Sequence, residues 1–333
     1  MPMRREPMKT DSKKSYRAYL SKEEIKFLRK PSDKRAFSMF IINWLMIAAC
    51  FVLIAYSNSV FLNILALFVM AGRQLGIGIL LHECSHRSFF SKLEWNQFFG
   101  HWFGGMPLLV PMDFYRPYHL SHHSKTGTKD DPDVKNIQQY PVTRWSLARK
   151  FIRDFSGLSG VKIIFGVVFY VLPNRSGDAV SMGRQTSKGR GEFDVKLALK
   201  NYAQALSFHA AFFSIFWLAG APSLYVYWWV CLVFVYPFII RMRQIAEHGA
   251  MTKLSSDDVR DTTRTTLARW WERLIFAPNF VNFHCEHHYL PTVPSYRLAE
   301  MHDLLKQRGF YDDKKSALVD RGGYLEVGRI AVL

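Results

Sequence analysis

The sequence contains four long apolar segments, and these constrain its fold more than any other feature. Residues 37–56 (FSMFIINWLMIAACFVLIAY) carry no charge over 20 positions, which as a helix would be about 30 Å long and would cross a bilayer. Three further apolar segments lie at 60–81, 201–219 and 224–240, of which 60–81 is interrupted by Arg73. The overall hydrophobic fraction of 49% hides this pattern because the apolar residues are concentrated in blocks. We therefore predict an all-α integral membrane protein with four transmembrane helices in two hairpins.

The positive charge of the chain predicts how these helices are oriented. The formal net charge is +17, and residues 1–35 alone carry twelve Lys and Arg against five acidic residues. Arg241 and Arg243 follow the fourth apolar segment, whereas the short turns 57–59 and 220–223 carry no charge. Under the positive-inside rule, we expect both termini and the long central loop in the cytoplasm. The membrane would be the inner or cell membrane of a bacterium, or the endoplasmic reticulum of a eukaryote.

The same positive charge bears on the possible partners. No motif typical of base recognition accompanies it, so we do not expect a nucleic-acid partner. Lipid headgroups and an acidic protein are the favoured partners. Four cysteines are present without a C-x-x-C pair, and two of them lie inside apolar segments, which favours a reducing compartment.

We expect three regions along the chain. Residues 1–36 would form a basic cytoplasmic segment, residues 37–305 a membrane domain, and residues 306–333 a cytoplasmic tail. Between the second and third spans, the stretches 98–111 and 161–172 are apolar but too short to cross a bilayer. If either one crossed alone, the histidine clusters described next would lie on opposite sides of the membrane. We therefore expect both stretches to be re-entrant or interfacial.

Eight of the twelve histidines fall into three clusters. The first, HECSH, contains His82 and His86 at the i, i+4 spacing of zinc metalloproteases, in which Glu83 would act as a general base. The other two are HLSHH at 119–123 and HCEHH at 284–288, where the i, i+3, i+4 spacing places three imidazoles on one helical face. Each cluster lies just beyond an apolar segment, so the predicted topology brings all three to the same face of the membrane.

The number of histidines indicates two metal ions rather than one. A catalytic zinc needs three protein ligands and an open position, whereas eight imidazoles suit two ions with about four ligands each. Imidazole binds zinc, copper, iron and nickel, so the donor type alone does not name the metal. A zinc protease built on HECSH is an alternative, but it would leave six of the clustered histidines unused. A metal or haem carrier is a further alternative, although carriers usually place ligands along their spans.

HECSH, HLSHH and HCEHH, in this order and separated by paired spans, resemble the three histidine boxes of integral-membrane fatty acid desaturases and related hydroxylases. The resemblance covers about residues 37–305. It implies a cytoplasmic helical cap that holds a histidine-rich dimetal site, a non-haem pair of iron ions, next to four transmembrane helices. It also implies that the iron ligands are the box histidines: His82, His86, His119, His122, His123, His284, His287 and His288.

The resemblance extends to residues outside the boxes. Members of the family often have a ninth ligand near the end of the last span, and His248 occupies the matching place, with Gln244 one turn earlier as a candidate to hold a metal-bound water. Liganding imidazoles usually donate their other N–H to a carboxylate or carbonyl. The candidate carboxylates for this role are Glu83, Glu247, Glu286 and the run DDPD at 130–133.

Three histidines remain outside the predicted metal site. His101 lies in the apolar stretch 98–111, where we expect it to pack or to line a substrate channel. His209, within the third span, and His302, near the C-terminus, are expected to be structural.

The resemblance implies an enzyme that introduces a double bond into a fatty acyl chain by using O2 and two external electrons. A hydroxylase or ketolase of an alkyl, sphingolipid, sterol-like or carotenoid substrate would use the same scaffold and is the alternative. No haem or flavin domain is visible, so the electrons would come from a separate ferredoxin- or cytochrome-type protein, and an acidic one would suit the basic chain. The third box begins with His284, where front-end desaturases tend to carry glutamine, which favours desaturation elsewhere on the acyl chain.

Overall fold

The computed structural model describes residues 19–134, 139–174, 194–251 and 256–333. The first half of the predicted basic segment, residues 1–18, lies outside the described residues. Helices make up most of the described chain, as predicted from the apolar blocks.

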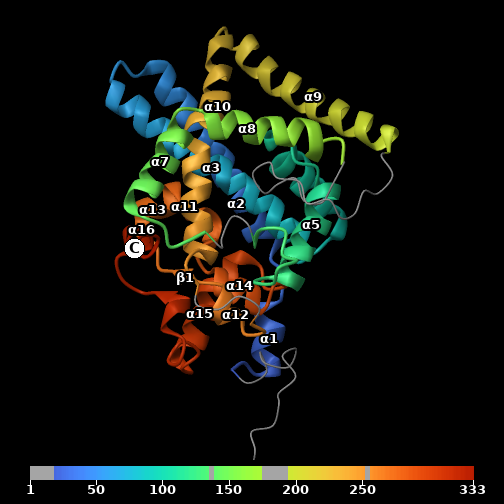
Figure 1. Cartoon of the computed structure of the whole chain (residues 1–333). Helices are drawn as coiled ribbons and strands as arrows, with labels where there is room; N and C mark the ends of the chain where they lie inside the picture. Colours follow the sequence, from blue (N-terminus) through green and yellow to red (C-terminus); the bar gives the residue numbers. More distant parts are fainter. Residues whose placement is uncertain (1–18, 135–138, 175–193, 252–255) are drawn as a thin grey trace, which may run out of the picture.

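Figure 1 shows the helices and strands in chain order. Up to residue 174 the helical elements are α1 (Lys22–Leu28), α2 (Asp33–Tyr56), α3 (Val60–Ser85), α4 (Leu93–Phe99), η2 (Gly100–Gly105), η3 (Met106–Leu108), α5 (Met112–Lys125), α7 (Arg144–Phe155), α8 (Leu158–Gly166) and η4 (Val167–Val171). From residue 194 they are α9 (Val195–Leu218), η5 (Pro222–Tyr225), α10 (Val226–Val230), η6 (Cys231–Val235), α11 (Tyr236–His248), α12 (Val259–Thr262), α13 (Trp270–Ile275), η7 (Pro278–Phe280), α14 (His284–Tyr289), η8 (Ser295–Arg297), α15 (Leu298–Gln307), η9 (Lys315–Ala317) and α16 (Gly323–Ile330). The strands are β1 (Thr265–Thr266) and β2 (Leu318–Val319).

Helices α2 and α3 occupy the first two predicted spans and pack against each other along their length. Helix α3 runs four residues beyond the predicted end of its span and so carries the first histidine box in its last turn. Arg73, in the middle of α3, is buried, and its Nη2 donates to the backbone carbonyls of Arg273 and Leu274 at 2.6 and 2.7 Å. These carbonyls lie at the end of α13, so the cost of burying a charge within a span is offset by carbonyl groups that the helix leaves unsatisfied.

Three helical runs are long and apolar enough to cross a membrane: Asp33–Tyr56, Val60–Ser85 and Pro222–His248, the last of which joins η5, α10, η6 and α11. Helix α9 occupies the predicted third span, but it is not among the described helices that meet this test. Helix α7 together with α8 and η4 meets it as a pair bent by 67°, a geometry found in broken spans and re-entrant loops. The composition therefore supports three or four crossings, and the order of four spans in two hairpins stays a prediction.

A buried ion pair fixes this bent pair of helices against α11. Asp154, near the end of α7, accepts hydrogen bonds from Arg241 Nε at 2.5 Å and from Arg241 Nη2 at 2.8 Å. Ser159, in the first turn of α8, donates to the same carboxylate at 2.6 Å. All three side chains are buried, so the carboxylate joins α7, α8 and α11 at one point.

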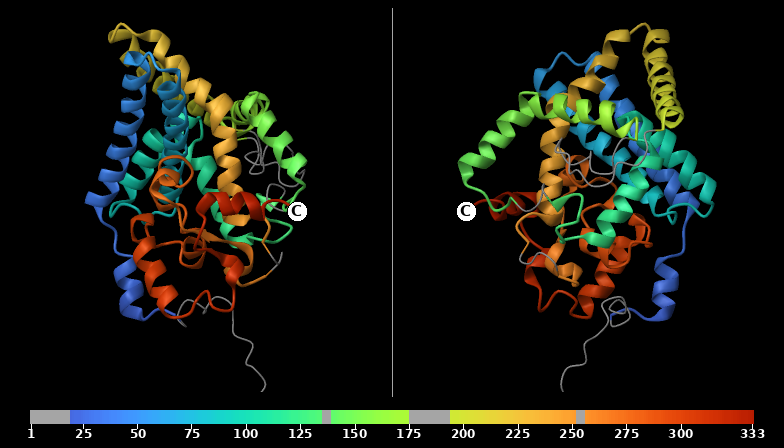
Figure 2. Two further views of the ribbon diagram at one scale, coloured as in Figure 1. Left: turned by 90° about the vertical axis from the view of Figure 1, so that its left-hand side faces the viewer. Right: turned by 45° about the vertical axis from the view of Figure 1, so that its right-hand side comes forward.

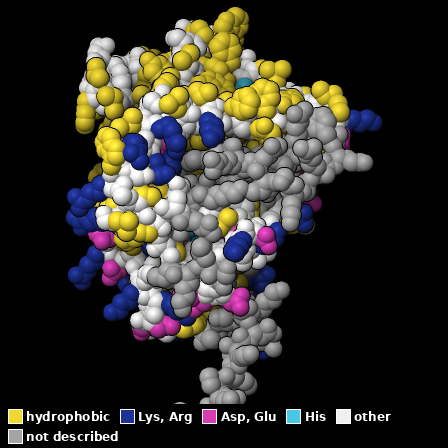
Figure 3. Space-filling model, viewed as in Figure 1, with side chains coloured by type: hydrophobic (Ala, Val, Ile, Leu, Met, Phe, Trp, Pro, Cys, Tyr) yellow, Lys and Arg dark blue, Asp and Glu magenta, His cyan; other side chains and the backbone are white. Residues whose placement is uncertain are grey.

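The elements after α11 form a cap at one end of the molecule. In Figures 1 and 2, α12, α14 and α15 lie at the end opposite the turn between α9 and α10. The two short strands pair in parallel, with Thr265 opposite Leu318 and Thr266 opposite Val319, which is a small departure from the all-helical prediction. In the view of Figure 3, hydrophobic side chains gather over the α9–α10 end, and many Lys, Arg, Asp and Glu side chains lie below it. This distribution is consistent with a membrane protein whose cap lies outside the hydrocarbon region.

The residues after 305 belong to this cap in the structure. They supply β2, which pairs with β1, and α16, which packs against α11. The predicted division between a membrane domain and a C-terminal tail stays a prediction.

Candidate metal centre

The structure brings all nine predicted metal-binding histidines together in two groups. The five-histidine group consists of His82, His86, His119, His123 and His287. The four-histidine group consists of His122, His248, His284 and His288. In each group one ring nitrogen from every residue lies within 4.8 Å of the corresponding nitrogens of the others. This is the arrangement that two ions with four or five imidazole ligands each would require.

Two helices contribute to both groups, and each divides its three histidines between the groups in the same way. In α5, His119 and His123 are four residues apart and belong to the five-histidine group, whereas His122 belongs to the other. In α14, His284 and His288 are four residues apart and belong to the four-histidine group, whereas His287 belongs to the other. The i, i+4 pair of each helix therefore holds one site, and the third histidine turns to the neighbouring site.

The remaining ligands come from the ends of the two long helices. His82 lies in the last turn of α3, and His86 is the residue that ends this helix. His248 is the last residue of α11. Since α3 and α11 both belong to runs that could cross a membrane, each run delivers its histidines at one end, as the sequence pattern predicted.

The ring nitrogens are placed as metal ligands would be. Neighbouring Nε2 atoms approach to 2.9 Å between His86 and His119 and to 2.8 Å between His248 and His284. His82 Nε2 and His288 Nε2 are buried without a hydrogen-bond partner among the described residues. A buried nitrogen left unsatisfied is costly, and a metal ion would accept its lone pair. The donor set fits a metal.

The protonation of the imidazoles also suits metal binding. Burial, and then the neighbouring imidazoles, hold the pKa of His119, of His123 and of His287 well below 6.5. Burial alone lowers the pKa of His86 to about 4. These rings are therefore neutral at pH 7, and each can offer a lone pair to a cation.

Acceptors on the outer side of the rings fix which nitrogen carries the proton. His82 Nδ1 donates to Glu83 Oε1 at 2.9 Å, and Glu83 Oε2 accepts from the backbone N–H of Ser295 at 2.7 Å. His122 Nδ1 donates to Asp131 Oδ1 at 2.8 Å. The hydrogen bond from His122 holds the pKa of the Asp131 carboxyl below its usual value, and an ionised carboxylate can only accept, so the proton of His122 lies on Nδ1 and leaves the Nε2 lone pair free for a metal.

Two oxygen atoms outside the predicted set act in the same way. The backbone carbonyl of Thr262 lies 2.9 Å from His248 Nδ1. Thr126 Oγ1 donates to the carbonyl of His122 at 2.6 Å and lies 3.3 Å from His288 Nδ1, so its lone pair can accept from that ring. Neither contact follows a sequence motif, since one is a main-chain atom and the other depends on how α5 ends.

Glu247, another of the predicted carboxylates, lies farther from its imidazole than Glu83 and Asp131 lie from theirs. Glu247 Oε1 accepts from Arg243 Nε at 2.6 Å and lies 3.6 Å from His284 Nδ1. Gln244 is half-buried on the same helix, and its proposed role with a metal-bound water stays a prediction.

Glu286 lies within the third box but faces away from both groups. Its carboxylate accepts from His302 Nδ1 at 2.5 Å, and also from the hydroxyls of Tyr311 and Thr265. The three donors come from α15, the segment after it and β1, so Glu286 fixes α14 to the cap. This confirms a structural place for His302, and the box sequence gave no signal for Tyr311 or Thr265.

The other two histidines lie outside both groups. His101 Nε2 is 3.2 Å from Gln204 Oε1, and His209 Nδ1 is 2.8 Å from the hydroxyl of Tyr225. Both side chains are buried, and these contacts give each a place in helix packing.

The geometry disfavours the zinc protease alternative. A protease of that class holds zinc with the two histidines of H-E-x-x-H plus one further ligand, and it keeps the glutamate free as a base. Here His82 and His86 share their group with three histidines from α5 and α14, and Glu83 is engaged by His82 and by the Ser295 backbone.

We expect Asp131→Asn to weaken metal binding by the four-histidine group about 10- to 100-fold, because the amide no longer fixes the proton on His122 Nδ1. Asp130→Asn is the matched control, since Asp130 is the exposed neighbour of the buried Asp131. Metal bound per chain after dialysis against a chelator distinguishes the two variants. Equal metal retention in both would contradict the role given to Asp131.

Comparisons with known proteins agree with this site. The fatty acid desaturase family profile matches residues 57–318. Dihydrorhizobitoxine desaturase of Bradyrhizobium elkanii is 25% identical over 272 residues, which cover 77% of this chain and 71% of that protein. An sn-1 oleoyl-lipid 12-desaturase of Synechocystis is 27% identical over 251 residues, which cover 70% of this chain and 65% of that protein.

A further relative matches over a shorter stretch. The sn-1 acyl-lipid omega-3 desaturase (ferredoxin) of Synechocystis is 27% identical over 149 residues, or 44% of this chain and 40% of that protein. The family profile, in contrast, covers well over half of the chain and includes all three histidine boxes. The chain therefore belongs to the fatty acid desaturase family of oxidoreductases.

Proposed function

We propose that this protein is a membrane-bound desaturase that introduces a double bond into a fatty acyl chain at a pair of iron ions. The observation that carries the proposal is the pair of histidine groups that share α5 and α14. The proposed iron ligands are His82, His86, His119, His122, His123, His248, His284, His287 and His288.

The proposed reaction explains why the site consists of ligands rather than acids and bases. An alkyl methylene has no acidic proton, and a bound iron pair would supply the O2-dependent oxidation that side chains cannot perform. Two hydrogens leave adjacent carbons, and O2 is reduced to two waters by two electrons from the substrate, two electrons from a donor and two protons. The residues of this chain keep the rings of His86, His119, His123 and His287 neutral through burial, place Glu83 and Asp131 against the rings of His82 and His122, and bury most of the site away from water.

Lipid analysis tests the reaction directly. We expect host cells that express the chain with a reductase and ferredoxin to accumulate acyl chains with a new double bond, and cells that express His287→Ala not to do so. New hydroxyl or keto groups in place of double bonds would favour the hydroxylase or ketolase alternative. Oxidation of dihydrorhizobitoxine in place of an acyl chain would match the relative that is named for that compound.

The electron donor is proposed to be a separate acidic protein of the ferredoxin or cytochrome type. The net charge of +17 supports this proposal, as does the similarity to a ferredoxin-dependent desaturase of Synechocystis. We expect the rate of reduction to fall steeply between about 10 mM and about 1 M salt, because the Debye length shortens from about 30 Å to about 3 Å. Stopped-flow reduction at both salt concentrations checks this, and equal rates would contradict steering by charge.

The proposed placement is a multi-pass membrane protein with both termini and both histidine groups on the cytoplasmic side. The basic residues that flank the apolar segments support this orientation. Labelling of single cysteines placed near Arg87 and near the C-terminus with an impermeant reagent tests it. If the two positions react from opposite sides of the membrane, the proposed placement is wrong.

A further inference from the structure

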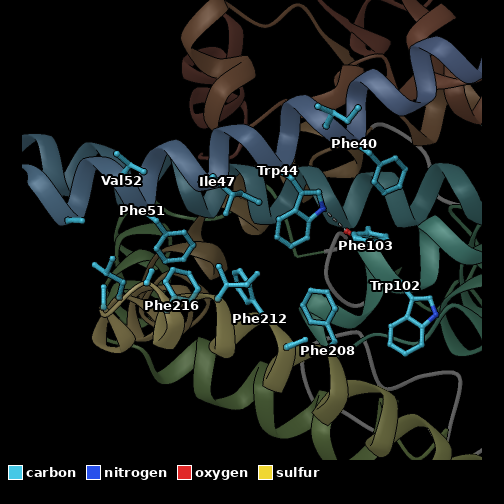
Figure 4. A pocket seen from close by; sticks show the side chains of 18 of the residues that line it. Phe40, Trp44, Ile47, Phe51, Val52, Trp102, Phe103, Phe208, Phe212 and Phe216 are labelled. Carbon is cyan, nitrogen blue, oxygen red and sulfur yellow. Dashed lines mark hydrogen bonds between the residues drawn. The ribbon is translucent and has the colours of Figure 1, made fainter.

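A long apolar groove lies beside the metal centre, between α2, η2 and α9. It has a volume of about 1030 Å³, and all of its lining residues are apolar. Figure 4 shows aromatic side chains along its walls, contributed by α2, by η2 and by α9. The lining includes Phe40, Ile41, Val52, Phe99, Ala48 and Ala211.

The walls of this groove are held by specific contacts. Trp44 of α2 stacks on Trp228 of α10, with ring centroids 6.2 Å apart and planes 4° apart, and its Nε1 donates to the carbonyl of Phe103 in η2 at 3.3 Å. Farther along, Phe51 of α2 meets Phe216 of α9 edge to face at 4.7 Å. The groove is therefore part of the packed structure, with α2 as one wall and α9 as the other.

The opening of the groove faces the side where hydrocarbon would lie. Ile41 and Val52 of α2 both line the groove and are 56% and 57% exposed. The lining on α2 runs from Phe37 to Tyr56, a distance of about 28 Å along a helix, which is close to the roughly 30 Å thickness of a bilayer core. Since α2 is a helix that could cross a membrane, an acyl chain of a bilayer lipid is the occupant that this position and lining fit.

One end of the groove leads to the helix turn that carries His82. Phe40 and Phe99 line the groove and belong to the buried cluster that contains Leu81 and Cys84, on either side of the first ligand. Segment η2 packs on the same turn through glycines. A Cβ on Gly104 would lie 2.9 Å from the backbone nitrogen of Leu81. This end of the groove is therefore in contact with the aromatic cluster and the η2 glycines that pack on the His82 turn.

We propose that the groove between α2, η2 and α9 receives an acyl chain of the substrate from within the bilayer, so that the enzyme acts on membrane lipid rather than on a water-soluble thioester or amino acid. This rests on the proposed function. Because the groove has an apolar lining and is open along α2, it can admit a chain sideways from the bilayer without exposing it to water.

Two pairs of adjacent alanines test the proposal. Ala48 lines the groove and Ala49 does not, although both are exposed on α2. On the opposite wall, Ala211 lines the groove and Ala210 does not, although both are exposed on α9. We expect Ala48→Trp and Ala211→Trp each to lower desaturation of phosphatidylcholine in proteoliposomes about tenfold, because the indole displaces several methylenes of the chain. Ala49→Trp and Ala210→Trp are expected to match wild type.

Binding is measured separately from turnover. Phosphatidylcholine with a diazirine on one acyl chain should photolabel wild-type α2, η2 and α9, and labelling should fall about tenfold in Ala48→Trp and Ala211→Trp but not in their neighbours. Size-exclusion chromatography of all four variants checks that they fold. If the groove variants label and turn over as their controls do, the groove proposal is wrong while desaturation by wild type stands. If wild type desaturates no acyl chain, the proposed function fails instead.

Discussion

Replacing His122 or His287 with alanine is expected to lower turnover more than about 100-fold while the protein still inserts into the membrane. The two residues represent different histidine groups, and each comes from a helix that serves both. Loss of an outer hydrogen-bond partner alone costs 10- to 100-fold, so loss of a ligand is expected to cost more. The measurement is the desaturation rate together with iron bound per chain, which we expect to fall in both variants.

His209→Gln is the matched control for these variants. His209 is also buried, but it contacts Tyr225 and belongs to neither group. We expect this variant to keep its iron and most of its activity. Wild-type activity in His122→Ala or in His287→Ala would show that the corresponding group is not a metal site.

Breaking the ion pair between Asp154 and Arg241 is expected to have the largest effect on stability. The two side chains are 0% and 3% exposed, so Asp154→Ala would leave the Arg241 guanidinium buried without its carboxylate. Removing one partner of a buried pair costs about 3–5 kcal/mol. For a chain of this size we expect Tm in detergent to fall by about 10 °C. Thermal unfolding followed by intrinsic fluorescence measures the change.

An exposed ion pair in the same chain is the control for that prediction. Glu326 and Arg329 are 3.1 Å apart, with side chains 37% and 80% exposed. Glu326→Ala should change stability by less than about 0.5 kcal/mol, because water screens such pairs. If Asp154→Ala and Glu326→Ala shift Tm equally, the buried ion pair does not stabilise the packing of α7 and α8 against α11.

The sequence was sufficient to predict which histidines meet. In a helix, the i, i+3, i+4 spacing found in α5 and α14 makes the three histidines neighbours. Each cluster also follows an apolar segment, which predicted that the clusters lie on the same side of the membrane. Which histidine serves which group was not predictable, because His122 and His287 turn away from their helix neighbours only when α3, α5, α11 and α14 are packed together.

Other features depend on contacts that no local pattern carries. Glu286 looked like a carboxylate for an imidazole ligand, yet its partners are His302, Tyr311 and Thr265, which are distant in the sequence. Arg73 is accommodated by two carbonyls of α13, a helix 200 residues away. Long-range pairings of this kind are set by the tertiary fold rather than by periodicity.

The residues that line the apolar groove could not be predicted from the sequence either. The uncharged apolar run 37–56 identified α2 as a span, but it could not show that Ala48 lines a groove and Ala49 does not. That difference depends on where α9 and η2 lie against α2, which the sequence of α2 alone does not specify.

Metal analysis of the purified wild-type protein tests the central claim most directly. Two histidine groups joined by α5 and α14 predict close to two irons per chain when the protein is produced with sufficient iron and is not exposed to chelators. A single zinc per chain, or no bound metal in a folded protein, would contradict the account.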